Sequence, residues 1–81
     1  MNVLKAAQET MALARAVGMQ NLDSDFTASN YPHLEKMLDK MEAGMPDDKM
    51  HRFLGWMQCS VYLSGLGPTH EDMKEINRRN Q

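Results

Sequence analysis

The 81-residue sequence contains a single cysteine, Cys59, so no disulfide can form within the chain. Its three histidines, His33, His51 and His70, are far apart, and none belongs to a Cys/His cluster with the spacing of a zinc site. Small domains are often stabilised by disulfides, a bound metal or a second subunit. We therefore expect no metal and no other cofactor. Of these three means of stabilising a small domain, self-association is the one that the sequence does not exclude.

Neither sign of charge predominates in the sequence. Eleven acidic and nine basic residues give a net charge of −2, which provides no general attraction to nucleic acid or anionic lipid. No apolar run approaches the ~20 residues of a transmembrane helix, and the first residues lack the basic and apolar segments of a signal peptide. We expect a cytoplasmic protein with no membrane partner.

Glycine and proline are few, at five and three, and they divide the remainder into segments with helical periodicity. Helices are predicted over residues 2–17, 31–43 and 47–64, followed by a short helix that begins near residue 69. Residues 19–30 form a polar connection anchored by Leu22 and Phe26. The chain is thus expected to be one all-α domain over residues 1–81, a compact bundle of three main helices plus a short C-terminal helix.

Residues with special backbone preferences support these helix ends. Gly18 suits the left-handed residue that ends a helix, and Pro32 suits a first helical turn. Asp47 is predicted to cap the third helix. Thr69 followed by Asp72 resembles a capping box, in which Asp replaces the usual Glu.

The segment 47–64 carries apolar residues on two opposite sides, and the second side holds Trp56, Cys59 and Leu63. A helix of this kind is central in its fold or contributes to a subunit interface. A two-fold dimer that pairs these helices and a closed monomer both fit the pattern. The predicted core consists of Leu4, Met11, Leu34, Leu38, Met41, Met50, Phe53, Leu54, Met57 and Val61.

A polar stripe lies between the two apolar sides of the same segment. Its side chains, beside Trp56, suit recognition of a partner protein, and Gly55 would let another backbone approach closely. The alternative is a solvated helix face whose glycine packs against a neighbouring helix. The candidate partner-binding residues are Asp48, Lys49, His51, Arg52, Gly55, Trp56, Gln58 and Tyr62.

The sequence shows no catalytic pattern. Cys59 would need a nearby histidine to act as a nucleophile, and on an apolar stripe it is better explained as a small core residue. Glu71 and Asp72 do not belong to paired E-x-x-E or E-x-x-D motifs on two helices. We predict a non-enzymatic protein without catalytic or metal-binding residues.

A small DNA-binding regulator is the alternative function, because residues 31–43, a short turn and residues 47–64 have the order of a helix-turn-helix. The second helix of that motif places its first residues against the bases. Here it begins with Asp47 and Asp48, which would repel phosphate, although Lys49, His51 and Arg52 follow. With the net charge of −2, this pattern argues against nucleic acid as the partner.

Residues 48–58 have the pattern D-K-x-x-R-x-L-G-x-x-Q, and Thr69–Asn77 would form a short Thr-led helix after it. The combination, which spans about half of the chain, resembles small accessory proteins of bacteriophages and prophages. That resemblance implies a bacterial cytoplasm and an accessory role, and it supplies no functional residue. The sequence therefore predicts a protein-interaction module that binds a host or phage protein, with self-association as an open alternative.

Overall fold

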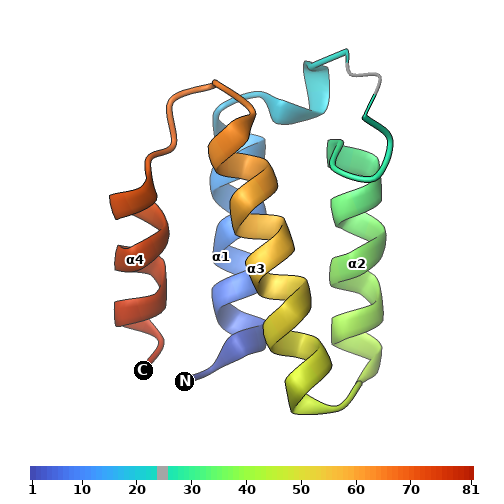
Figure 1. The fold of residues 1–81 in the computed structure, drawn as a ribbon, viewed down its shortest axis with the longest axis vertical. Helices are drawn as coiled ribbons and strands as arrows, with labels where there is room; N and C mark the ends of the chain where they lie inside the picture. The colour runs from blue at the N-terminus through green and yellow to red at the C-terminus, as the bar shows by residue number, and fades with distance from the viewer. Residues whose placement is uncertain (24–25) are drawn as a thin grey trace.

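The computed structural model describes residues 1–23 and 26–81, and every regular element in these ranges is a helix. The elements are α1 (Val3–Ala16), the short 3-10 helix η1 (Met19–Asn21), α2 (Tyr31–Ala43), α3 (Asp47–Leu63) and α4 (His70–Arg79). The predicted fold class is confirmed, because three main helices and a short C-terminal helix form one compact bundle (Figure 1).

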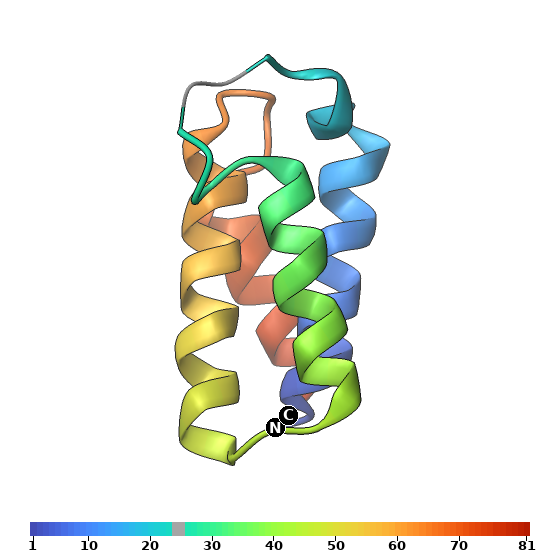
Figure 2. The ribbon, with the colours of Figure 1, turned by 90° about the vertical axis from the view of Figure 1, so that its right-hand side faces the viewer.

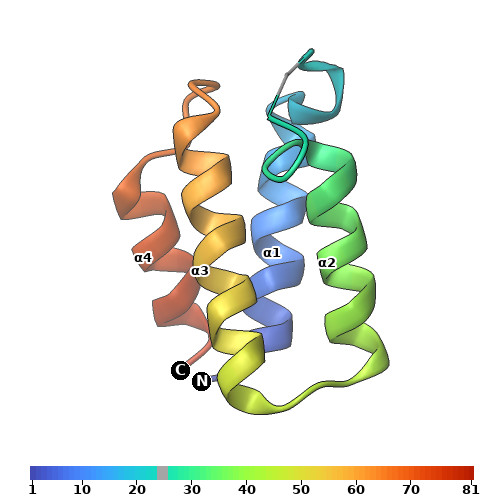
Figure 3. The ribbon, with the colours of Figure 1, turned by 45° about the vertical axis from the view of Figure 1, so that its right-hand side comes forward.

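Helix α1 is central in the bundle, because it contacts α2, α3 and α4. Helices α2 and α3 run antiparallel and are joined at one end by residues 44–46 (Figure 3), and α4 lies on the side of the bundle away from α2 (Figure 1). The two ends of the chain meet at the same end of the bundle (Figure 2), where the backbone N–H of Asn2 donates to the carbonyl of Asn80 at 2.6 Å.

The helix ends follow local chemistry, with one exception. Gly18 has φ +85°, the left-handed conformation predicted for the residue after the first helix. Thr69 and Asp72 form the predicted capping box, each side chain accepting from the other residue's backbone N–H. The predicted Asp47 cap is wrong: Pro46 holds the cap position without a side-chain hydrogen bond, and Asp47 is the first helical residue. There its carboxylate is stabilised by the positive end of the α3 dipole instead.

The core is formed along α1 and the inward sides of α2 and α3. Six of the ten predicted core residues are buried, namely Met11, Leu34, Met41, Leu54, Met57 and Val61. The other four, Leu4, Leu38, Met50 and Phe53, are partly buried and pack against the same cluster. The prediction omitted the alanines of α1: Ala6, Ala7 and Ala14 are fully buried. Their small side chains let α1 pack closely against its neighbours.

Helix α4 contributes Met73 and Ile76 to the core, and both are buried. Its opposite side is charged, with ion pairs that join Glu71, Lys74, Glu75 and Arg78 along the surface. Exposed pairs of this kind contribute little stability, so burial of the apolar edge contributes more than they do to holding α4 against the bundle.

Candidate functional site

The largest exposed apolar side chains lie on the outward side of α3 and on the connection before α2. Leu63 is 72% exposed, Trp56 is 49% exposed and Phe26 is 77% exposed. Leu22 and Tyr62 are also exposed. We refer to the exposed residues Gly55, Trp56, Cys59, Tyr62 and Leu63 as the α3 face.

The indole of Trp56 is held in place although half of it is exposed. Its Nε1–H donates to the backbone carbonyl of Ala28 at 3.0 Å, which ties α3 to the connection. The Oγ of Ser60, one turn later on α3, donates to the carbonyl of Trp56 at 2.8 Å. A large aromatic side chain whose orientation is already fixed loses little conformational entropy when a partner covers it.

A groove of about 430 Å³ lies between α3 and the connection beside Trp56. Several of its polar lining groups already have partners within the chain: Ser64 Oγ donates to the carbonyl of Val61, and Asn30 Oδ1 accepts from the backbone N–H of His33. The groove thus offers mainly apolar area to an occupant. It is lined by Met19, Leu22, Phe26, Ser29, Asn30, Tyr31, Trp56, Cys59, Ser60, Leu63 and Ser64.

Most of the candidate partner-binding residues share one exposed side of α3. Asp48, His51 and Arg52 are exposed near its beginning. Lys49 is exposed too, and its ammonium lies 5.7 Å from the centre of the Phe53 ring, a cation–π contact within the same helix. The ring of Tyr62, near the end of α3, lies 6.4 Å from that of His70 at the start of α4.

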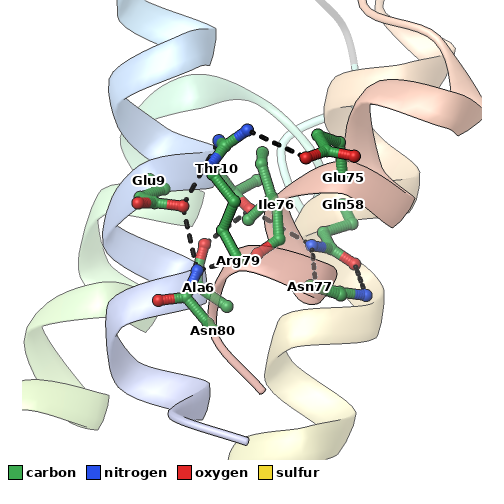
Figure 4. A network of polar contacts seen from close by, with 9 residues as sticks. All are labelled: Ala6, Glu9, Thr10, Gln58, Glu75, Ile76, Asn77, Arg79 and Asn80. Carbon is green, nitrogen blue, oxygen red and sulfur yellow. Dashed lines mark hydrogen bonds and ion pairs between the residues drawn. The ribbon is translucent and has the colours of Figure 1, made fainter.

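Gln58 differs from the other candidates because its side chain is half-buried within the bundle (Figure 4). Its Nε2 donates to Asn77 Oδ1 at 2.8 Å and to Thr10 Oγ1 at 3.3 Å, and its Oε1 accepts from Asn77 Nδ2 at 3.3 Å. These bonds connect α3 with α4 and α1. The placement gives Gln58 a role in holding the helices together.

A second set of bonds fastens the end of α4 to α1 in the same region (Figure 4). Asn80 Nδ2 donates to Glu9 Oε2 at 2.9 Å and to the carbonyl of Ile76 at 2.8 Å, and Arg79 pairs with the same Glu9 oxygen at 3.4 Å. All the buried side-chain polar atoms in the described part of the chain have a hydrogen-bond partner. The polar groups of this network therefore serve to hold α1, α3 and α4 together.

Gly55 lies in the middle of α3 and is exposed, so the structure does not pack it against a neighbouring helix of its own chain. A Cβ built there would meet nothing within 4 Å. Glycine inside a helix costs about 1 kcal/mol relative to alanine. Nothing within the monomer offsets that cost.

The expectation that Cys59 is a small core residue is wrong, because its thiol side chain is exposed in the groove. Its stripe, with Trp56 and Leu63, is turned away from the core, since α1 and α2 cover only the inward side of α3. No group of three or more potential metal-ligating side chains comes together among residues 1–23 and 26–81. No helix in these ranges is long and apolar enough to cross a membrane.

The geometry of α2 and α3 gives no support to the helix-turn-helix alternative. The two helices of that motif cross at about 90–120°. Here they run antiparallel as neighbours in the bundle (Figure 2), as in a helical hairpin. No family model, curated protein or solved structure matches the chain.

Proposed function

We propose that the chain is a non-enzymatic protein-interaction module that binds its partner through the α3 face and the adjoining groove. The observation that carries the proposal is Trp56, an aromatic side chain that is fixed by a hydrogen bond to Ala28 and remains half exposed beside Leu63. Tryptophan side chains fixed in this way are typical centres of binding energy at protein interfaces.

The size of the apolar surface supports the proposal. With fully exposed aromatic side chains at about 150–250 Å², the exposed parts of Trp56, Tyr62, Leu63, Phe26 and Leu22 together amount to roughly 500–600 Å². Contiguous apolar patches of more than a few hundred Å² on a small protein usually mark a contact surface. Covering such a patch with protein removes it from water.

The chemistry of the groove favours an apolar, protein-like occupant. The hydroxyls of its three serines and the side-chain oxygen of Asn30 are engaged in bonds within the chain, so they supply few free donors or acceptors for a polar ligand. Charged residues stand at one end of α3, at Asp48 and Arg52. An apolar core with a polar rim is the usual composition of a protein–protein interface.

Site-specific photocrosslinking in bacterial cells tests this function, and the resemblance to phage and prophage proteins makes such cells the appropriate setting. Benzoylphenylalanine is placed at Leu63, which is exposed on the α3 face, and, as the matched control, at Lys40, which is exposed near the end of α2. We expect a discrete protein adduct from position 63 and none from position 40. Absence of an adduct at position 63, or equal labelling at both positions, would contradict the proposal.

A further inference from the structure

We infer that the protein covering the α3 face is a second copy of the same chain, packed with its α3 antiparallel to the first about a two-fold axis close to Gly55 and Cys59. The inference rests on the proposed interaction function and names its partner. It is carried by the shape of the face, by its area and by the distribution of charge along α3.

The α3 face is narrow in the middle and bulky on both sides. With about 100° between successive residues, Gly55 and Cys59 lie along its centre, Trp56 and Leu63 on one side, and Tyr62 on the other. Apart from the neighbouring backbone of α3 itself, a Cβ at Gly55 would meet no atom within 4 Å. A second helix can approach closely over these two small residues while its own bulky residues lie beside them, as in ridges-into-grooves packing. Such a face is complementary to itself.

The exposed apolar side chains supply most of the area of one half of a dimer interface. A standard interface buries about 800 Å² on each partner. The exposed apolar side chains supply roughly 500–600 Å² of this area. Gly55, Cys59 and Arg52, which lie between or next to them on α3, add to the area that a second helix would cover. A two-fold axis covers both patches at once, because each copy supplies the surface that the other needs.

Charge along the exposed side of α3 selects the antiparallel orientation. The charged residues Asp48 and Arg52 lie in its first half together with His51, and the exposed residues of its second half, Cys59, Tyr62 and Leu63, include no acidic or basic residue. A parallel pair would place each charged group against its own copy. An antiparallel pair places the charged half against the uncharged half and also opposes the two helix dipoles.

Sedimentation equilibrium of the full chain at micromolar concentrations tests the dimer. We expect the parent to reach twice the mass of one chain, and Trp56→Glu to remain monomeric. Ala12→Glu is the matched control, because it adds the same charge at an exposed position of α1, and it should associate like the parent. Far-UV circular dichroism verifies that each variant is folded. A parent that is monomeric over the whole range, or a Trp56→Glu variant that still dimerises, overturns the inference.

Gly55→Ala is a second variant that leaves the helix intact, because the added methyl group meets nothing in the monomer. If a second α3 crosses there, the methyl group separates the two helices and weakens association by roughly tenfold or more. Unchanged association of Gly55→Ala contradicts an axis at this position.

Cross-linking tests the orientation. With the axis level with residue 57 and a rise of ~1.5 Å per residue, the two Cys59 residues are offset by only about 6 Å along the helices, whereas the two Asp48 residues are roughly 27 Å apart. A short bis-maleimide should therefore join Cys59 of one copy to Cys59 of the other. Asp48→Cys in a Cys59→Ser background should not be joined, and efficient cross-linking at position 48 overturns the antiparallel arrangement.

The mass of the photocrosslinked adduct at Leu63 separates this inference from the proposed function. An adduct of twice the chain mass supports the second copy. An adduct with a different protein and none with the same chain leaves the interaction function in place and overturns the dimer. The absence of any adduct removes both.

Discussion

Leu54 is 3% exposed on the inward side of α3, where it belongs to the core shared with α1 and α2. Leu54→Ala removes buried apolar atoms and leaves a cavity, and such changes lower the free energy of unfolding by about 2–5 kcal/mol. That is a large part of the 5–15 kcal/mol typical of a small domain. Urea unfolding followed by far-UV circular dichroism measures the loss. Thermal unfolding gives a second measurement. A melting temperature within a degree or two of that of the parent would show that Leu54 is not part of the core.

Gly55, the next residue along the chain, has the opposite expectation for stability. Its φ is not in the left-handed region, and a Cβ meets no atom within 4 Å. Gly55→Ala should therefore raise the free energy of unfolding of the monomer by about 1 kcal/mol, since alanine restricts the unfolded chain and favours the helix. The measurement compares the double variant Gly55→Ala/Trp56→Glu with the single variant Trp56→Glu. Self-association through the α3 face is then absent from both proteins. Destabilisation in this comparison would mean that α3 requires glycine for its own packing.

At the scale of the elements, the capping box at the start of α4 is a local device with a measurable contribution. Thr69→Ala removes the oxygen that accepts from the backbone N–H of Asp72 at 3.1 Å. We expect a loss of about 1 kcal/mol in the free energy of unfolding. Thr27→Ala is the control, because Thr27 is exposed and lies outside every helix. Equal losses from the two threonines would argue against a specific capping effect.

The bonds between Gln58 and Asn77 join α3 to α4, and a double-mutant cycle measures their coupling. Gln58→Met or Asn77→Leu alone leaves the other amide without its partner, at a cost of about 1–3 kcal/mol. In the double variant both polar groups are gone, so the loss should be smaller than the sum of the single losses by about 0.5–3 kcal/mol. Additive losses would show that the two side chains act independently in the fold.

The helices were predictable from the sequence because their signals are local. Gly18, Thr69 and Asp72 act through backbone geometry and hydrogen bonds that span three or four residues, and the apolar periodicity gives the inward side of each helix. Asp47 was predicted to be the cap of α3, although it is the first helical residue. The error arose because aspartate is favoured both at the cap and in the first helical turn. Local preference cannot separate these two adjacent positions.

The candidate site was less predictable because it depends on contacts between distant residues. Trp56 is fixed by Ala28, 28 residues earlier in the chain, and no periodic pattern encodes that bond. Gln58 appeared in the polar stripe on spacing alone, and its role depends on α4 docking where Asn77 reaches it. The second apolar stripe of α3 was visible in the sequence. Whether another helix of the same chain covered it depended on the arrangement of the whole bundle.

For the molecule as a whole, α1 and α3 each have a helix face with small residues at its centre, and the two faces differ in what covers them. The alanines of α1 are fully buried and bring the helices of one chain together. Gly55 and Cys59 are exposed on the other side of α3, where the chain provides no covering helix. Trp56 stands beside that surface and is the only tryptophan in the sequence, so intrinsic fluorescence reports on this surface alone.

Dilution of the parent protein should therefore change its tryptophan emission if a second copy covers the α3 face. In the dimer the indole of Trp56 loses its contact with water, so the emission maximum lies at shorter wavelength and iodide quenches it weakly. On dilution the indole returns to its half-exposed state, and both the wavelength and the quenching should increase together. Ala12→Glu should show the same transition, because its substitution is on α1. The comparison uses the concentrations at which sedimentation resolves both monomer and dimer. If emission and quenching stay constant over that range, the dimer contact lies elsewhere on the surface.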